Sequence, residues 1–135
     1  MSTPKTLLDM AGAPDRPQRL AVSAVVMIDA QLEYVTGRLP LTGVGAALEV
    51  GAELLAAARA AGRPVIHVQH RGLGDGLFGP DSAFFAIAPQ VAPVADEPVV
   101  EKGVPNAFAD GALDARLKQL GVSKIIIGGF MTHLC

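Results

Sequence analysis

Cysteine is nearly absent from this sequence, since the 135 residues contain only Cys135. One cysteine cannot form a disulfide within the chain or build a cysteine-rich zinc site, and this usage fits a reducing cytoplasm. Long apolar runs are also lacking: the strongest, around 25–28, is far too short to span a bilayer. Residues 1–18 have no apolar stretch of the kind found in a signal peptide. We therefore expect a cytoplasmic protein that does not bind a membrane.

Charge of one sign is lacking as well. The formal net charge is −2, from 11 basic and 13 acidic residues, and no basic block occurs. This pattern gives no support for binding to nucleic acid or to an anionic membrane. Half of the residues are hydrophobic and 18% are charged, which excludes a disordered chain and allows one domain with a buried core. A small molecule is the expected partner.

The order of apolar segments predicts an α/β fold. Residues 1–18 are expected to form an arm that packs on a partner subunit, and residues 19–135 to form the domain. Its first strand is nearly continuously apolar, which is typical of a parallel sheet covered on both faces. The alternation of strands and helices predicts such a sheet. We expect strands over 21–29, 64–70, 98–102 and 124–129, and helices over 44–61 and from 110 to about 120.

Helical spacing identifies the expected buried positions. Leu48, Leu55 and Ala58 recur at helical spacing in the first helix. In the second helix, the expected buried stripe consists of Leu113, Leu117 and Leu120. Asp110 is the expected N-cap, and Asp114 and Lys118 are expected to form an ion pair.

Four reactive residues fall at or just after the ends of the expected strands: Asp29, His70, Lys102 and Cys135. Right-handed crossovers place the carboxyl ends of parallel strands on one edge of the sheet, where α/β proteins bind ligands. The sequence therefore predicts a site that combines a thiol, an ammonium, a carboxylate and an imidazole.

These side chains suit acyl transfer. A free cysteine has a pKa of about 8.5, and we expect a helix beginning near Cys135 and the charge of Lys102 to lower it. Asp29 can relay the proton from the thiol to a leaving amine. Backbone N–H groups of the turn at 129–135 are candidates for an oxyanion hole. Together these groups predict a reaction through a thioester.

Other residues have weaker signals. His67 lies inside an apolar strand and is expected to be structural, and His67 and His70 point to opposite faces, so they do not form a metal site. The glycines of 74–79 fit a dinucleotide pattern by letter, but Pro80 follows and no helix opens there, so we predict an active-site loop. Four phenylalanines are expected either to line an apolar pocket or to pack in the core, namely Phe78, Phe84, Phe85 and Phe108.

From about Leu20 to Cys135, three ordered motifs occur: 26–31 (VMIDAQ), 99–108 (VVEKGVPNAF) and 127–135 (IGGFMTHLC). In these the chain resembles the isochorismatase-like cysteine hydrolases. The resemblance implies a three-layer α/β/α fold with a mostly parallel, Rossmann-like sheet, a homo-oligomer, and a triad of Asp29, Lys102 and Cys135. It also implies a cis peptide at Phe130–Met131, with the N–H groups of Met131 and Cys135 at the oxyanion. We assign Gln31, His70, Phe108 and His133 to substrate contacts.

The resemblance also limits the chemistry. Nicotinamidases of this family use a metal-binding Asp-x-His, but no aspartate occurs between Asp29 and Asp75, so we expect no metal and no cofactor. Family members that hydrolyse isochorismate lack the cysteine as a rule, so Cys135 favours cleavage of an amide or carbamoyl-like C–N bond. Members continue past this cysteine, and we expect the present sequence to be the leading part of a longer chain. Three alternatives remain open: hydrolysis of a vinyl ether, a non-catalytic oligomeric binding protein, and a dinucleotide-dependent oxidoreductase.

Overall fold

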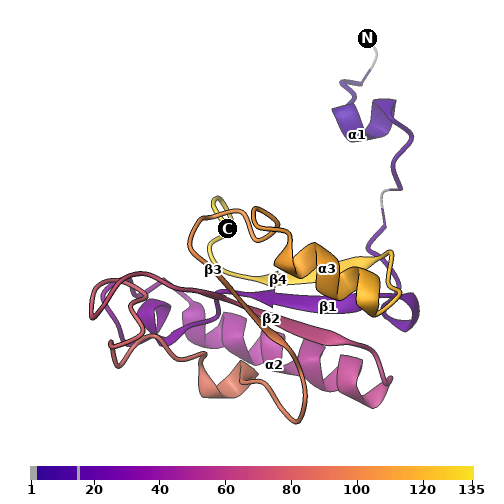
Figure 1. Ribbon diagram of the computed structural model, residues 1–135. Helices are drawn as coiled ribbons and strands as arrows, with labels where there is room; N and C mark the ends of the chain where they lie inside the picture. Colours follow the sequence, from indigo (N-terminus) through magenta and orange to yellow (C-terminus); the bar gives the residue numbers. More distant parts are fainter. Residues whose placement is uncertain (1–2, 15) are drawn as a thin grey trace.

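The computed structural model describes residues 3–14 and 16–135. Within these residues, four strands form one parallel sheet in the order β3-β2-β1-β4 (Figure 1). The strands are β1 (Ala24–Ile28), β2 (Val65–His70), β3 (Val99–Lys102) and β4 (Ile125–Gly129). Helix α2 (Val44–Ala60) covers one face of the sheet and α3 (Ala112–Gln119) covers the other. The predicted three-layer α/β/α architecture is therefore confirmed.

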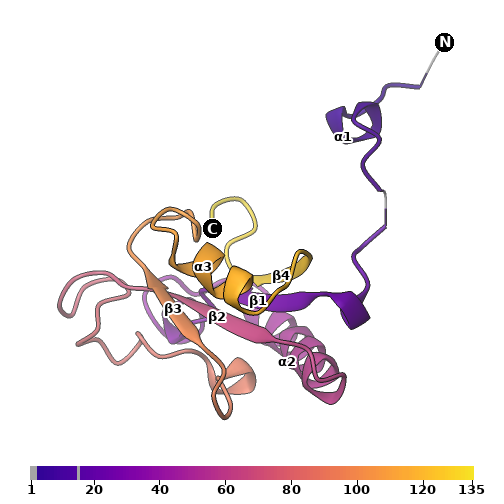
Figure 2. The same ribbon diagram turned by 45° about the vertical axis from the view of Figure 1, so that its right-hand side comes forward.

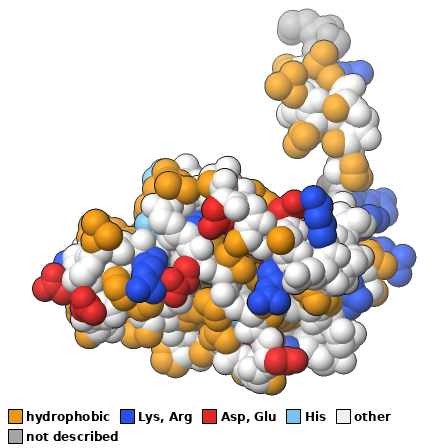
Figure 3. Space-filling view, viewed as in Figure 1, with side chains coloured by type: hydrophobic (Ala, Val, Ile, Leu, Met, Phe, Trp, Pro, Cys, Tyr) orange, Lys and Arg blue, Asp and Glu red, His pale blue; other side chains and the backbone are white. Residues whose placement is uncertain are grey.

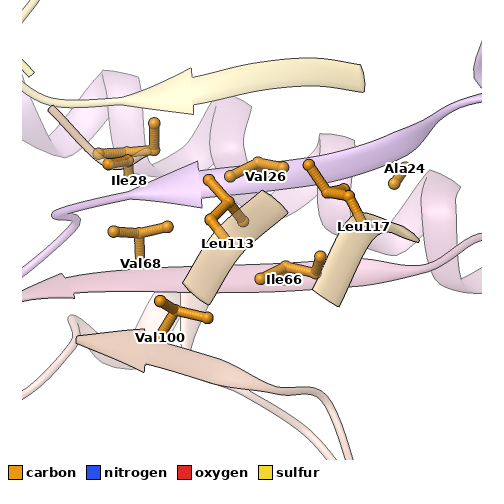
Figure 4. Close-up of a cluster of buried hydrophobic side chains, with 9 residues drawn as sticks. Ala24, Val26, Ile28, Ile66, Val68, Val100, Leu113 and Leu117 are labelled. Atoms are coloured by element: carbon orange, nitrogen blue, oxygen red, sulfur yellow. The ribbon is translucent and has the colours of Figure 1, made fainter. Parts of the chain in front are cut away.

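The strand β1 is buried on both faces, which explains its unbroken apolar sequence. All five of its residues are buried, and they alternate between two hydrophobic clusters. Val26 and Ile28 point to the cluster under α3, which Figure 4 shows with Leu113 and Leu117 above the sheet. Val25 and Met27 point to the cluster against α2. Because successive side chains of a strand point to opposite faces, β1 contributes residues to both hydrophobic clusters, one against α2 and one against α3.

Helix α2 forms where the sequence predicts it. Its alanines and leucines have high helix propensity, and Gly43 precedes it in the left-handed conformation with φ 72°. Leu48, Leu55 and Ala58 are buried as their spacing predicts. Full burial of a leucine side chain stabilises the fold by about 2 kcal/mol.

Helix α3 differs from the prediction at both ends. The predicted N-cap is Asp110, but the N-cap in the structure is Gly111. Asp110 lies one residue earlier, and its side chain accepts a hydrogen bond from the N–H of Ala112, the first residue of the helix (3.0 Å). Leu113 and Leu117 are buried, but Leu120 is 44% exposed. The expectation that Leu120 belongs to the buried stripe is wrong, because the helix ends at Gln119 and the chain turns away there. The predicted ion pair is present, with Lys118 Nζ 2.7 Å from Asp114 Oδ2 on the surface.

The arm stands away from the domain in both views (Figures 1 and 2). It carries the short helix α1 (Leu7–Met10), whose N-terminus is held by reciprocal hydrogen bonds between Thr6 and Asp9. The Leu7 and Leu8 side chains are 84% and 70% exposed. The division between residues 18 and 19 stays a prediction.

Short 3-10 helices occupy the connections: η1 (Leu20–Val22), η2 (Leu32–Tyr34) and η3 (Pro89–Val91). Among the described residues, no helix is both long and apolar enough to cross a membrane.

Candidate active site

The parallel sheet brings the predicted reactive residues to one edge. Asp29 directly follows β1, while His70 and Lys102 are the last residues of β2 and β3 and are paired in register. The turn that carries Cys135 follows β4, whose Gly129 is paired with Ile28 of β1. Residues far apart in the sequence therefore converge because they share the carboxyl ends of neighbouring strands.

Asp29 and Lys102 form a buried ion pair. Lys102 Nζ donates to Asp29 Oδ2 at 2.7 Å, and the two side chains are only 3% and 1% exposed. The backbone of Asp29 has φ 53°, a region that non-glycine residues rarely occupy but aspartate tolerates. Its N–H donates to Val68 O at 2.8 Å, which holds this conformation at the strand end. Asp29 Oδ1 is buried and accepts no hydrogen bond of good geometry from the described residues.

Lys102 makes a second bond, to His70. The distance from Lys102 Nζ to His70 Nδ1 is 3.0 Å. An ammonium group has only donors, so Nδ1 is the acceptor and the proton of the neutral ring sits on Nε2. Burial lowers the pKa of His70, and the charge of Lys102 lowers it further, while Asp29 acts in the opposite direction. The imidazole is therefore neutral at physiological pH.

Gln31 is fully buried and uses its amide on the backbone. Its Nε2 donates to His70 O (3.0 Å) and Phe85 O (2.9 Å), and its Oε1 accepts from the His70 N–H (2.9 Å). Both amide hydrogens are thus already engaged. The role of Gln31 as a substrate contact stays a prediction, and its position favours fixing the end of β2.

An aromatic cluster connects the two sides of the site. The Phe78 ring meets both His70 and Tyr34 edge to face, with centroids 5.2 and 5.1 Å apart. Tyr34 in turn meets Phe130 at 5.8 Å. Burial, together with Cys135, Asp29 and Glu33, raises the pKa of Tyr34 to about 12. The hydroxyl therefore stays protonated near the thiol.

Sequence reasoning missed Tyr34 and Glu33. The Glu33 carboxylate is fully buried and accepts the N–H groups of Arg38 (2.7 Å) and Phe78 (3.1 Å). It ties the predicted active-site loop to the turn after β1. Their position directly after the first motif could have pointed to both residues, because the turn that begins at Gln31 continues through them.

The turn after β4 holds the thiol. The Phe130–Met131 peptide is cis, as the resemblance implies, and Leu134 N–H donates to Met131 O (3.1 Å). Cys135 is half-buried and borders a cavity of about 330 Å³ with Met131 and Thr132. The expectation that a helix begins near Cys135 stays a prediction.

The pKa of Cys135 is raised, which contradicts the expectation that it is lowered. Burial raises it first, and Asp29 raises it further through a hydrogen bond and its negative charge. Lys102 and the Met131 backbone N–H lower the pKa, but by less than burial and Asp29 raise it. The sequence argument counted the cation and a helix terminus, and it left out the desolvation of the thiol.

The Met131 backbone N–H lies beside the Cys135 sulfur and lowers the pKa of the thiol, and the oxyanion role of Met131 and Cys135 stays a prediction. His133 is exposed and lines a hollow with Leu41 and Thr42, and Phe108 is 42% exposed. No hydrogen bond joins either side chain to the ion pair within the described residues. Their assignment to the substrate stays a prediction.

His67 lies away from this site. It is fully buried, and its Nε2 is 2.9 Å from Glu97 Oε1. Glu97 also accepts two hydrogen bonds from Arg59 (2.9 and 2.8 Å). Within residues 3–14 and 16–135, no three His, Cys, Asp or Glu side chains gather as metal ligands do.

Comparison with known families and proteins agrees with this geometry. The model of the isochorismatase domain matches residues 23–135. The secreted isochorismatase effector Isc1 of Verticillium dahliae is 35% identical over 127 residues, which are 93% of this chain and 67% of that protein. A streptothricin hydrolase of Streptomyces noursei is 32% identical over 84% of this chain and 41% of its own length.

Solved structures give the same result. An isochorismatase from Pseudomonas putida KT2440 superposes with a TM-score of 0.91 and 39% identity, covering 98% of this chain and 68% of that one. A cysteine hydrolase from Pseudomonas syringae gives a TM-score of 0.77 and 26% identity, covering 89% and 64%. The chain thus spans about two thirds of the length of most of these relatives. Because the domain model matches residues 23–135 and the fold superposes on a solved isochorismatase, the chain belongs to the isochorismatase family of hydrolases.

Proposed function

We propose that this chain carries the site of a cysteine hydrolase that cleaves an amide or carbamoyl-like C–N bond of a small molecule. The observation that carries the proposal is the Asp29–Lys102 pair (2.7 Å) beside a thiol on which both groups act. The relatives named streptothricin hydrolase and cysteine hydrolase support this class.

In the first half-reaction Asp29 is the general base. It takes the thiol proton as the sulfur attacks the carbonyl carbon, so that the neutral thiol need not ionise beforehand. Lys102 holds the carboxylate in place and compensates its charge. The oxyanion of the tetrahedral intermediate accepts hydrogen bonds from the N–H groups of Met131 and Cys135. Asp29 then gives its proton to the nitrogen, the C–N bond breaks, and a thioester remains.

In the second half-reaction Asp29 takes a proton from water, and the resulting hydroxide attacks the thioester. The C–S bond breaks, the acid leaves, and the proton returns to the sulfur. These steps use only a nucleophile, a base and N–H donors, so we propose that the reaction needs no metal and no cofactor.

A non-catalytic binding protein is the second candidate, and the raised pKa of Cys135 favours it. A thiol that is neutral at rest is less reactive than the thiolates of many cysteine enzymes. The two candidates differ in whether acylation of the sulfur occurs.

We also propose a homo-oligomer in which the arm packs on a partner subunit. The exposed Leu7, Leu8 and Met10 of α1 support this, and Figure 3 shows apolar side chains gathered on the arm. Light scattering of the intact chain and of Leu8→Asp is the test. A monomer at all concentrations would contradict it.

A cytoplasmic location is proposed from the single cysteine, although one relative is named as secreted. Over the face drawn in Figure 3, acidic and basic side chains are interspersed, which gives no support for nucleic acid as a partner.

The test of the function is a screen of small amides and carbamoyl compounds for released ammonia or amine, with mass spectrometry of the protein. We expect an acyl adduct on Cys135 that appears within turnover and is absent in Cys135→Ala. Turnover that persists in Cys135→Ala would overturn the proposal. An unacylated Cys135 with every compound that binds would favour the binding protein.

A further inference from the structure

His70 ends β2 with its ring turned toward Lys102. We propose that His70 is a positioning residue, which holds the Lys102 ammonium beside Asp29 through its Nδ1 atom. This inference rests on the proposed function and deepens it. It gives His70 a task that differs from the substrate contact expected from the sequence.

The bonding of Lys102 fixes the direction of the effect. Its Nζ has two acceptors in the structure, Asp29 Oδ2 at 2.7 Å and His70 Nδ1 at 3.0 Å. A lysine side chain loses rotamer entropy when it is held in one place. Two acceptors that converge on one ammonium from β1 and β2 define its position better than a single carboxylate does.

The His70 ring is itself held from two sides. Gln31 bonds to both the N–H and the carbonyl oxygen of His70 (2.9 and 3.0 Å), which fixes the backbone at the end of β2. Phe78 meets the ring edge to face at 5.2 Å. A side chain clamped in this way can present one nitrogen in a constant direction.

Charged groups face the His70 ring and affect whether it stays neutral, as acceptance of a hydrogen bond at Nδ1 requires. These groups are Lys102, from β3, and Asp29, from the end of β1. Because the pKa of His70 is lowered from its ordinary value of 6.5, the ring is neutral at any pH above 6.5. A protonated ring could not accept a hydrogen bond at Nδ1. Positioning of Lys102 is therefore expected to persist throughout the neutral range.

The two possible roles of His70 use different nitrogens, and this allows a direct test. His70→Asn places an amide oxygen close to the position of Nδ1, whereas His70→Gln reaches toward the position of Nε2. His70→Leu keeps the bulk and offers no acceptor. A positioning role through Nδ1 predicts that asparagine restores the alkylation rate of Cys135 and that glutamine does not, and rescue by glutamine alone would overturn it.

The experiment measures the rate of Cys135 alkylation by iodoacetamide against pH, with folding checked by circular dichroism. Lys102 lowers the pKa of Cys135, so a displaced ammonium should make the thiol less reactive. At neutral pH we expect His70→Leu to slow alkylation at least about threefold, as Lys102→Met does, and His70→Asn to stay within about twofold of the unchanged chain. His67→Asn, in the same strand but facing Glu97, is the matched control and should leave the profile unchanged.

An independent readout uses the unchanged chain. Nitrogen-15 NMR of the histidine rings should show His70 as the neutral Nε2–H tautomer at neutral pH. An Nδ1–H tautomer or an imidazolium there would overturn the inference.

The failures can be told apart. If Lys102→Met changes the alkylation profile and His70→Leu does not, His70 does not position Lys102, and the proposed function stands. If neither variant changes the profile, Lys102 does not act on the thiol, and the proposed function fails with the inference.

Discussion

Lys102 Nζ lies 2.7 Å from Asp29 Oδ2, although 73 residues separate the two in the chain. Both side chains are almost completely buried, and both act on Cys135. The carboxylate makes the thiol harder to ionise and the ammonium makes it easier. This balance gives the first prediction.

Removing one charge at a time should change the reactivity of the thiol in opposite directions. Asp29 raises the pKa of Cys135 through a hydrogen bond and its charge, so Asp29→Asn should lower that pKa and speed alkylation several-fold at neutral pH. Lys102→Met should slow it. The pH profile of iodoacetamide modification measures both. An unchanged profile in both variants would show that burial alone controls the thiol.

The same pair should matter for stability. Lys102→Met leaves the Asp29 carboxylate buried without its partner, which we expect to cost about 3–5 kcal/mol of unfolding free energy. The double variant Asp29→Asn/Lys102→Met should recover part of this loss. Urea denaturation measures the difference. Lys118→Met removes an exposed ion pair and is the control, with no measurable loss of stability expected.

Glu97 should contribute to the way in which the free energy of unfolding depends on pH in the acid range. Burial would raise its pKa, but hydrogen bonds from Arg59, His67 and the Val94 N–H lower it to about 2, below the ordinary 4.5. Because the folded pKa is depressed, this stabilisation is fully present above pH 4.5 and is lost as the pH falls toward about 2.

We expect Glu97→Gln to lose about 2 kcal/mol at neutral pH and to flatten the acid limb of the stability curve. Denaturant titrations across this pH range are the measurement. An unchanged acid limb in Glu97→Gln would mean that other carboxylates control acid unfolding.

Gly129 should tolerate no side chain. It has φ 138°, and a Cβ there would collide with the backbone of Ile28. Gly129→Ala is therefore expected to cost about 2 kcal/mol or more and to displace the turn that carries Cys135.

Gly128→Ala is the matched control for this position. A Cβ at Gly128 would meet Met27 Cε at 3.4 Å, an ordinary contact, so its cost should stay within about 1 kcal/mol. Thermal unfolding and alkylation of both variants are compared. Equal losses would show that the conformation of Gly129 is not decisive.

The sequence predicts the positions of the strands and the convergence of the site well, for a physical reason. The continuous apolarity of 24–28 requires cover on both faces, and parallel strands with helical crossovers place Asp29 and Lys102 on one edge. The burial of Leu48, Leu55 and Ala58 follows in the same way from helical period.

Features that depend on three-dimensional burial were not predictable. The raised pKa of Cys135 results from desolvation, which a strand pattern does not report. The sequence assigns Gln31 to a substrate contact, which stays a prediction. Only the contacts show its amide bonded to the backbone of His70 and Phe85. Leu120 has the right period but lies one residue past the helix.

The strand order has a consequence for how the chain acquires its chemistry. Among the described strands, Lys102 ends β3 and Cys135 follows β4, with β1 and β2 between them. A chain with β4 detached would display a thiol without Asp29 and Lys102, whereas a chain with β3 detached would leave the thiol beside Asp29 alone. Chemical labelling of the sulfur can therefore report whether β3 and β4 have joined the sheet.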